Sequence, residues 1–154
     1  MATEIERKFL TSSDAWKREA IGMQVRQGYL PTDPSCAVRV RVIGPDAFLT
    51  LKGPTSGATR LEYEYRIPQA DAEEILAKLC GSTLIEKTRY RIRHSDHVWE
   101  VDEFHGGNEG LVVAEIELSE LSEPFAKPSW AGEEVTSDPR YLNVNLANHP
   151  YSTW

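Results

Sequence analysis

Acidic and basic side chains recur at every second position in several short segments of the chain. Carboxylates occupy such positions at Glu4, Glu6, Glu62, Glu64, Glu100, Asp102, Glu115 and Glu117. Cations occupy them at Lys8, Arg39, Arg41, Lys52, Arg66, Lys87, Arg89 and Arg91. Carboxylate oxygens are the ligands that hard cations such as Mg²⁺ prefer, and guanidinium and ammonium groups bind phosphoryl oxygens. Together the two sets predict a site for a ligand with cationic and anionic parts, such as a metal-bound polyphosphate.

The charges also separate by sign along the chain. Residues i and i+2 of a strand lie only ~7 Å apart, so a pair such as Arg39 and Arg41 repels unless an opposite charge lies near. Burying so many ions in a dry core would cost several kcal/mol for each of them. The pattern therefore favours a hydrated lumen that holds a ligand. The simpler alternative stays open, in which the charged faces point to bulk water, as in a protein-interaction domain.

The segments that carry these charges have the period of β-strands. Alternation of polar and apolar residues predicts strands at residues 4–9, 37–42, 48–52, 61–67, 86–92, 98–104 and 112–118. Turn sequences such as Gly44-Pro45-Asp46 separate them. Each strand then has one apolar and one charged side. Strands joined by short turns predict an antiparallel meander that is closed, or nearly closed, into a barrel.

Three helices are expected beside the strands, so the fold class is α+β, mainly β. Residues 70–80 carry an apolar stripe and end before Gly81, which suits a helix C-terminus. Residues 12–20 predict a shorter helix. Asp138 followed by Pro139 predicts the start of a last helix that continues through Leu146.

Length and composition narrow the class of protein. The 154 residues, 40% of them apolar, suit a single domain spanning residues 1–154. A formal net charge of −7 argues against nonspecific binding to nucleic acid. The sequence shows neither the ~20 apolar residues of a membrane span nor a signal peptide. Because Cys36 and Cys80 make no disulfide framework, a cytoplasmic location is expected.

The sequence lacks the motifs of several other common kinds of functional site. The sequence has neither a phosphate-cradling G-x-x-x-x-G-K-[ST] loop nor a G-x-G-x-x-G turn. It places no Ser or Cys in a nucleophile-elbow context. The histidines, which a zinc site would use, fall in predicted turns and in the tail and are interpreted as solvated.

The same residues resemble a known family. Glu4-Ile5-Glu6-Arg7-Lys8 has the E-x-E-x-K form of the CYTH superfamily, the triphosphate tunnel metalloenzymes. The supporting motifs follow in the family's order: Arg39-Val-Arg41, Leu51-Lys52-Gly53, Glu62-Tyr-Glu64, Glu86-Lys87-Thr88-Arg89-Tyr90, Asp102 and Glu115-Ile-Glu117. The resemblance implies an eight-stranded antiparallel barrel or open cup that holds a divalent metal and a triphosphate. It also supplies an eighth strand near residues 23–30, which the alternation does not define.

The resemblance implies a role for each part of the charged set. The phosphate-binding residues are expected to be Lys8, Arg39, Arg41, Lys52, Lys87 and Arg89. The ligands of Mg²⁺ or Mn²⁺ are expected to be Glu4, Glu6, Asp102, Glu115 and Glu117. Glu62 and Glu64 would complete a second metal site or orient the attacking water. Tyr29 would either contact Lys8 or have a packing role. Arg66, Arg91 and Glu100 are left without a role.

The shortness of the chain favours hydrolysis of inorganic triphosphate to pyrophosphate and phosphate. The alternatives within this family are a class IV adenylyl cyclase and a thiamine or nucleoside triphosphatase. Outside enzymes, the alternative is a polyphosphate- or nucleotide-binding module. A homodimer is also plausible, because the apolar strand faces exceed what three helices would cover.

Overall fold

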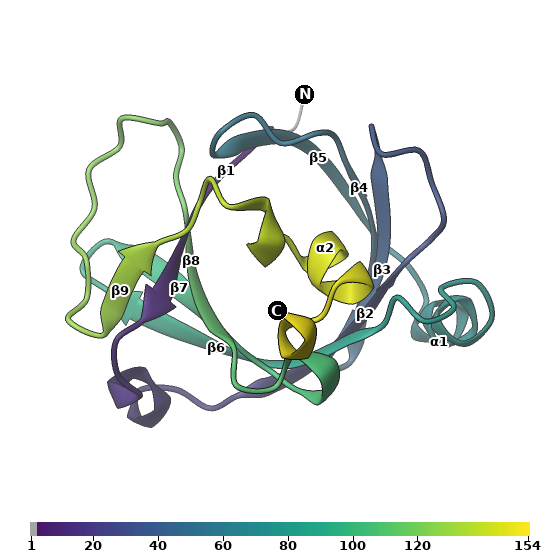
Figure 1. Cartoon of the computed structure of the whole chain (residues 1–154), viewed down its shortest axis with the longest axis horizontal. Coiled ribbons are helices and arrows are strands. Elements are labelled where there is room, and N and C mark those ends of the chain that lie inside the picture. The colour runs from purple at the N-terminus through teal and green to yellow at the C-terminus, as the bar shows by residue number, and fades with distance from the viewer. Residues whose placement is uncertain (1–2) are drawn as a thin grey trace.

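The computed structural model describes residues 3–154, and Figure 1 shows it as a ring of strands. The strands are β1 (Thr3–Thr11), β2 (Met23–Tyr29), β3 (Ala37–Ile43), β4 (Asp46–Lys52), β5 (Thr59–Arg66), β6 (Ile85–His94), β7 (His97–Phe104), β8 (Val112–Glu117) and β9 (Ala131–Glu134). The hydrogen-bonded order is β5-β4-β3-β2-β6-β7-β8-β1, and antiparallel pairing of β5 with β1 closes the ring. The predicted eight-stranded antiparallel barrel is confirmed, and it is closed.

Strand β1 closes the barrel because its two edges pair with different strands. One edge pairs with β8 over residues 6–10. The other edge pairs first with β5 over residues 3–5 and then, after the two strands diverge, with β9. Strand β9 therefore lies outside the ring as an extension of the sheet (Figure 1).

All the strands predicted from alternation are confirmed, with ends shifted by two residues at most. The eighth strand, expected near residues 23–30, is β2. Strand β9 was not predicted, because its sequence Ala-Gly-Glu-Glu is short and shows no apolar alternation. It forms because β1 extends beyond β5 and leaves an unpaired edge there.

The helices match the expectations less closely. Helix α1 (Gln69–Lys78) confirms the helix predicted at 70–80. The helix predicted at 12–20 is wrong, since that segment forms only the 3₁₀ turn η1 (Ala15–Arg18). One turn is enough to bury Trp16 against Tyr90, and the flanking polar residues gain nothing from a longer helix.

The predicted last helix is split in two. The 3₁₀ turn η3 (Pro139–Tyr141) comes first, and α2 (Asn143–Asn148) follows after the extended backbone of Leu142. Two further 3₁₀ turns, η2 (Gly106–Asn108) and η4 (Tyr151–Thr153), complete the elements. Among residues 3–154 no helix is long and apolar enough to span a membrane.

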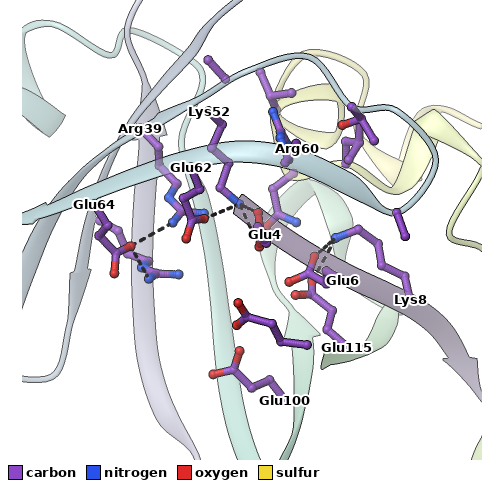
Figure 2. Close-up of a pocket in the computed structure, with 18 of the residues that line it drawn as sticks. Glu4, Glu6, Lys8, Arg39, Lys52, Arg60, Glu62, Glu64, Glu100 and Glu115 are labelled. Atoms are coloured by element: carbon purple, nitrogen blue, oxygen red, sulfur yellow. Dashed lines mark hydrogen bonds and ion pairs between the residues drawn. The ribbon is translucent and has the colours of Figure 1, made fainter. Parts of the chain in front are cut away.

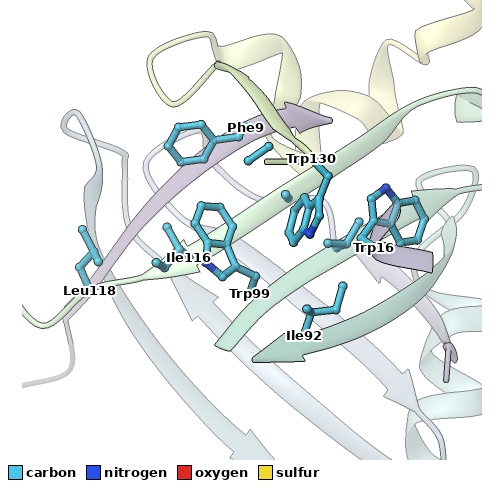
Figure 3. Close-up of a cluster of buried hydrophobic side chains, with 10 residues drawn as sticks. Phe9, Trp16, Ile92, Trp99, Ile116, Leu118 and Trp130 are labelled. Carbon is cyan, nitrogen blue, oxygen red and sulfur yellow. The ribbon is translucent and has the colours of Figure 1, made fainter. Parts of the chain in front are cut away.

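The apolar strand faces point outward and are covered on two sides. An aromatic cluster covers β1, β6, β7 and β8, with Trp99 at its centre (Figure 3). The Trp99 ring centroid lies 5.5 Å from Phe9, 5.7 Å from Trp130 and 5.9 Å from Phe125. On the other side, α1 packs Leu76 and its neighbours over β3 and β4. These two cores brace the wall whose inner face carries the charges.

The inner face turns apolar at one end of the barrel. Two residues beyond Lys8, Glu115, Asp102 and Lys87, on the same strand faces, lie Leu10, Val113, Phe104 and Ile85. Tyr141 of η3 and the fully buried Leu146 of α2 pack against this apolar end. Figure 1 shows the C-terminal segment across the opening of the ring. The barrel is thus covered at this end by its own C-terminus.

Replacing Trp99 by Ala should lower the free energy of unfolding by roughly 3–5 kcal/mol, because it leaves a cavity at the centre of the aromatic cluster. Urea unfolding followed by circular dichroism measures this loss. The matched control is Val98→Ala on the same strand, where the side chain is 44% exposed and the change should be small. Equal losses in the two variants would contradict the assignment of Trp99 to the outer core.

Candidate functional site

A cavity of about 250 Å³ occupies the lumen of the barrel. Each of the eight barrel strands contributes at least one side chain to its wall. Of the residues predicted for the site, the wall includes Glu4, Glu6, Lys8, Tyr29, Arg39, Arg41, Lys52, Glu62, Glu64, Lys87, Arg89, Glu115 and Glu117. Figure 2 shows carboxylates and cations from distant parts of the sequence pointing into the same space. The predicted shared, charged lumen is therefore present.

Some residues depart from the prediction. Arg91 and Glu100, which had no predicted role, line the cavity. Arg66 does not line it, and its guanidinium pairs with Asp46 at 2.6 Å on the exposed rim. Arg60 also lines the cavity and was not predicted, although it has the same strand parity as Glu62 and lies only one residue before the predicted strand 61–67.

Asp102 lies on the inner face of the barrel but is buried against Lys87 and Arg89 and does not line the cavity. Its side chain is fully buried, and its carboxylate accepts hydrogen bonds from Lys87 Nζ at 2.8 Å and from Arg89 Nε at 2.7 Å. Burial alone would raise the pKa of Asp102, but Arg89 and Lys87 outweigh it and hold the pKa well below its usual range. This geometry makes Asp102 the counterion that fixes two lumen cations, while its predicted role as a metal ligand stays a prediction.

Lys87 is also held by the C-terminal segment. The side-chain oxygen of Asn143, the first residue of α2, accepts from Lys87 Nζ at 2.9 Å and from Gln27 Nε2 at 3.2 Å. Burial lowers the pKa of Lys87 to about 8, because the attraction of Asp102 compensates only in part and Arg89 adds repulsion. Asn143 had no predicted role, since contacts made by a distant C-terminal turn leave no signal in the strand pattern.

Lys8 lies between two carboxylates of the lumen. Its ammonium group donates to Glu6 at 2.9 Å and to Glu115 at 3.2 Å. Burial would lower the pKa of Lys8, but Glu115 and Glu6 raise it above its ordinary value. Tyr29 lines the same cavity, yet its hydroxyl accepts from Gln27 Nε2 at 3.2 Å. In the described part of the chain no hydrogen bond joins Tyr29 to Lys8, so their predicted contact stays a prediction.

One side of the cavity has more positive charge than its carboxylates neutralise. Arg39 and Arg41 converge on a single carboxylate, Glu64, at 3.5 and 3.2 Å. Within residues 3–154 the buried Nε atoms of both arginines lack a hydrogen-bond partner. Burial and the neighbouring cations Arg39 and Arg89 lower the pKa of Arg41 to about 10. A buried N–H without an acceptor is costly, so this arrangement is suited to a bound anion.

The opposite side has an excess of negative charge. Glu117 lies opposite Glu6 in the pairing of β1 with β8. Desolvation, together with Glu4, Glu6, Glu62 and Glu100, raises the pKa of Glu117 to about 7, although much of its surface is exposed. Carboxylates that repel one another in this way are suited to a bound cation.

The donor set of this acidic side fits a hard divalent metal, because it consists of carboxylate oxygens and the described part of the wall includes no His or Cys. As the side chains stand, no three His, Cys, Asp or Glu groups among residues 3–154 are gathered closely enough to hold a metal. Several of these carboxylates pair with lysines instead, as Glu4 does with Lys52 at 3.1 Å. Metal binding would therefore replace ammonium partners.

Comparison with known proteins identifies the family of this chain. The family model described as the CYTH domain matches residues 2–151. The chain belongs to the CYTH family. This CYTH protein is 53% identical over 154 residues to an inorganic triphosphatase of Acetivibrio thermocellus, covering 100% of this chain and 99% of the relative. It is 42% identical over 150 residues to an inorganic triphosphatase of Nitrosomonas europaea, covering 94% and 97% of the two chains.

Solved structures show the same fold. The CYTH protein aligns with the crystal structure of the inorganic triphosphatase NE1496 at a TM-score of 0.67 and 38% identity, covering 96% of this chain and 95% of the other. A putative adenylate cyclase from Bacillus halodurans aligns at a TM-score of 0.61 and 21% identity, covering 78% and 83%. At that identity the second likeness shows the fold alone.

Replacing Asp102 by Asn should lower the free energy of unfolding of the CYTH protein by about 3–5 kcal/mol, because it leaves Lys87 and Arg89 buried without their counterion. Since the pKa of Asp102 is depressed in the fold, its contribution is present at neutral pH and is lost as the pH falls below the ordinary Asp range. Urea unfolding at pH 7 and pH 3 measures both effects. A variant as stable as the wild type at pH 7 would contradict this role.

Replacing Glu117 by Gln should stabilise the fold above pH 7, whereas replacing Asp102 by Asn should destabilise it. The pKa of Glu117 is raised in the fold, so its ionised form destabilises the protein above pH 7, and this penalty disappears as the pH falls toward 4.5. The variant should therefore melt at a higher temperature than the wild type at pH 8 and at nearly the same temperature at pH 5. Thermal unfolding in the presence of a chelator measures the difference. A lower melting temperature at pH 8 would contradict the prediction.

Proposed function

We propose that this CYTH protein hydrolyses inorganic triphosphate to pyrophosphate and phosphate with the help of a divalent metal. The observation that carries the proposal is the separation of two opposite charge excesses inside one cavity. Arg39 and Arg41 keep unpaired buried donors on one side, and Glu117 is crowded by carboxylates on the other. A metal-loaded polyphosphate satisfies both sides at once. The two relatives named inorganic triphosphatase support the same choice.

In this proposal six cations of the wall hold phosphoryl oxygens. They are Lys8, Arg39, Arg41, Lys52, Lys87 and Arg89. The arginines bind in forked geometry and the lysines act as point charges. Asp102 and Asn143 accept hydrogen bonds from the Lys87 ammonium group, so this group is in place before substrate arrives. Such positioning supplies much of the rate in phosphoryl transfer, where the protein needs little covalent chemistry.

The carboxylates would hold Mg²⁺ or Mn²⁺, with Glu4, Glu6, Glu115 and Glu117 facing the cavity and Asp102 buried beside Lys87 and Arg89 on the same inner face. A bound divalent ion would neutralise phosphate charge and lower the pKa of the attacking water. Of the two acids proposed to orient that water, Glu62 is the better placed. Among residues 3–154 it pairs only with Lys52, at 3.1 Å, whereas one oxygen of Glu64 accepts from Arg39, Arg41 and Thr50.

Replacing Glu6 by Gln or Arg41 by Ala should lower triphosphate turnover by two orders of magnitude or more, on the scale of losing a charge-stabilising group, while the melting temperature stays close to that of the wild type. Release of orthophosphate from tripolyphosphate with Mg²⁺ or Mn²⁺ measures turnover, and a chelator should abolish it.

The matched controls are Glu74→Gln and Arg18→Ala, which change exposed residues on α1 and η1 outside the cavity and should leave turnover unchanged. Wild-type protein that releases no phosphate from tripolyphosphate with either metal between pH 7 and pH 10 would contradict the proposed function. Formation of a cyclic nucleotide and pyrophosphate from ATP would replace it by the cyclase alternative.

A further inference from the structure

Arg60 is a cation of the cavity wall that no motif and no part of the proposed mechanism uses. It lies on β5 two residues before Glu62, on the same face of the strand, and is the pairing partner of Glu4 on β1. Figure 2 shows it among the lining side chains, near Lys52 and Glu4. Residues of the turn that precedes β5, including Thr55 and Gly57, line the same part of the wall.

Arg60 differs from the other cations of the wall in its partners. Each of the others has a carboxylate within 4.0 Å, as ion pairs show for Lys8, Arg39, Arg41, Lys52, Lys87, Arg89 and Arg91. Within residues 3–154 Arg60 forms no such pair. Its acidic neighbour Glu4 is already paired with Lys52 at 3.1 Å.

The Arg60 side chain is nevertheless held in place. Its Nε donates to the backbone oxygen of Gly53 at 3.0 Å, at the end of β4. This one bond uses one of the five N–H donors of the guanidinium. The two terminal nitrogens have no hydrogen-bond partner among the described residues, and they are not among the fully buried unsatisfied atoms. The group is thus anchored at one edge and keeps its fork accessible in the cavity.

We propose that Arg60 binds a phosphoryl group of the substrate at the wall formed by β5 and the preceding turn. The proposal rests on the proposed function, since it adds a substrate contact to that same cavity. An anchored guanidinium loses little conformational freedom on binding, and its planar fork matches two phosphoryl oxygens. A purely structural role would need only the bond to Gly53 and would not require the side chain to reach the cavity.

Replacing Arg60 by Ala should raise KM for tripolyphosphate about tenfold or more and leave kcat within about a factor of two, because a ground-state contact to charge is lost. Replacing it by Lys should recover part of the loss, since the charge remains but the fork does not. The matched control is Arg66→Ala on the same strand face, whose guanidinium pairs with Asp46 outside the cavity. It should leave both constants unchanged.

Calorimetric binding of tripolyphosphate to each protein in a chelator provides a second measurement that does not depend on turnover. Arg60→Ala should weaken this binding, and Arg66→Ala should not. An unchanged KM and unchanged binding in Arg60→Ala, or a lower melting temperature as its sole effect, would overturn the assignment while leaving the triphosphatase intact. Wild-type protein without turnover would instead overturn the proposed function, and the binding comparison would still decide the role of Arg60.

Discussion

The structure depends on incomplete charge neutralisation inside a closed barrel. The described residues that line the cavity include seven carboxylates and eight cations, so the total charge of this wall is nearly balanced. The charges are not mixed evenly, because each strand contributes mostly one sign and the ring order keeps acidic and basic strands partly apart. The chain as a whole has a formal charge of −7, yet its lumen does not share that excess. Local placement, and not net charge, thus decides which ligand the protein can hold.

The charged side chains of the lumen are held in position by packing outside the barrel and by ion pairs inside it. Two outer cores, one around Trp99 and one under α1, fix the strands whose inner faces carry the ions. On the inner side, the buried carboxylate of Asp102 holds Lys87 and Arg89 together despite their mutual repulsion. Desolvated ions cannot reorganise cheaply, so a lumen built in this way keeps its charges in position without a ligand.

The sequence predicts the barrel well because alternation with period two identifies both the strands and their inner faces. The alternation does not predict how deeply each inner side chain is buried. Asp102 and Glu100 occupy equivalent positions in the pattern, yet one is fully buried and the other lines the cavity. Contacts set by chain closure are also invisible in the pattern, as for β9, which pairs with the free edge of β1, and for Asn143, which reaches Lys87 from the C-terminal segment. Tyr29 is a further example, because the hydrogen-bond partner of its hydroxyl is Gln27, which the strand pattern does not indicate.

Exposure to solvent changes along the barrel axis, and the strength of the electrostatic interactions changes with it. At the end covered by α2, the apolar layer with Ile85 and Leu146 lies next to Lys87, which is 1% exposed. Farther along the same strand, the side chain of Arg91 is 66% exposed. Because charge interactions strengthen as water is excluded, an anion near Lys87 and Arg89 would experience a stronger field than one near Arg91. The C-terminal segment therefore belongs to the site in an energetic sense, since it keeps water away from the end where the cations are held most firmly.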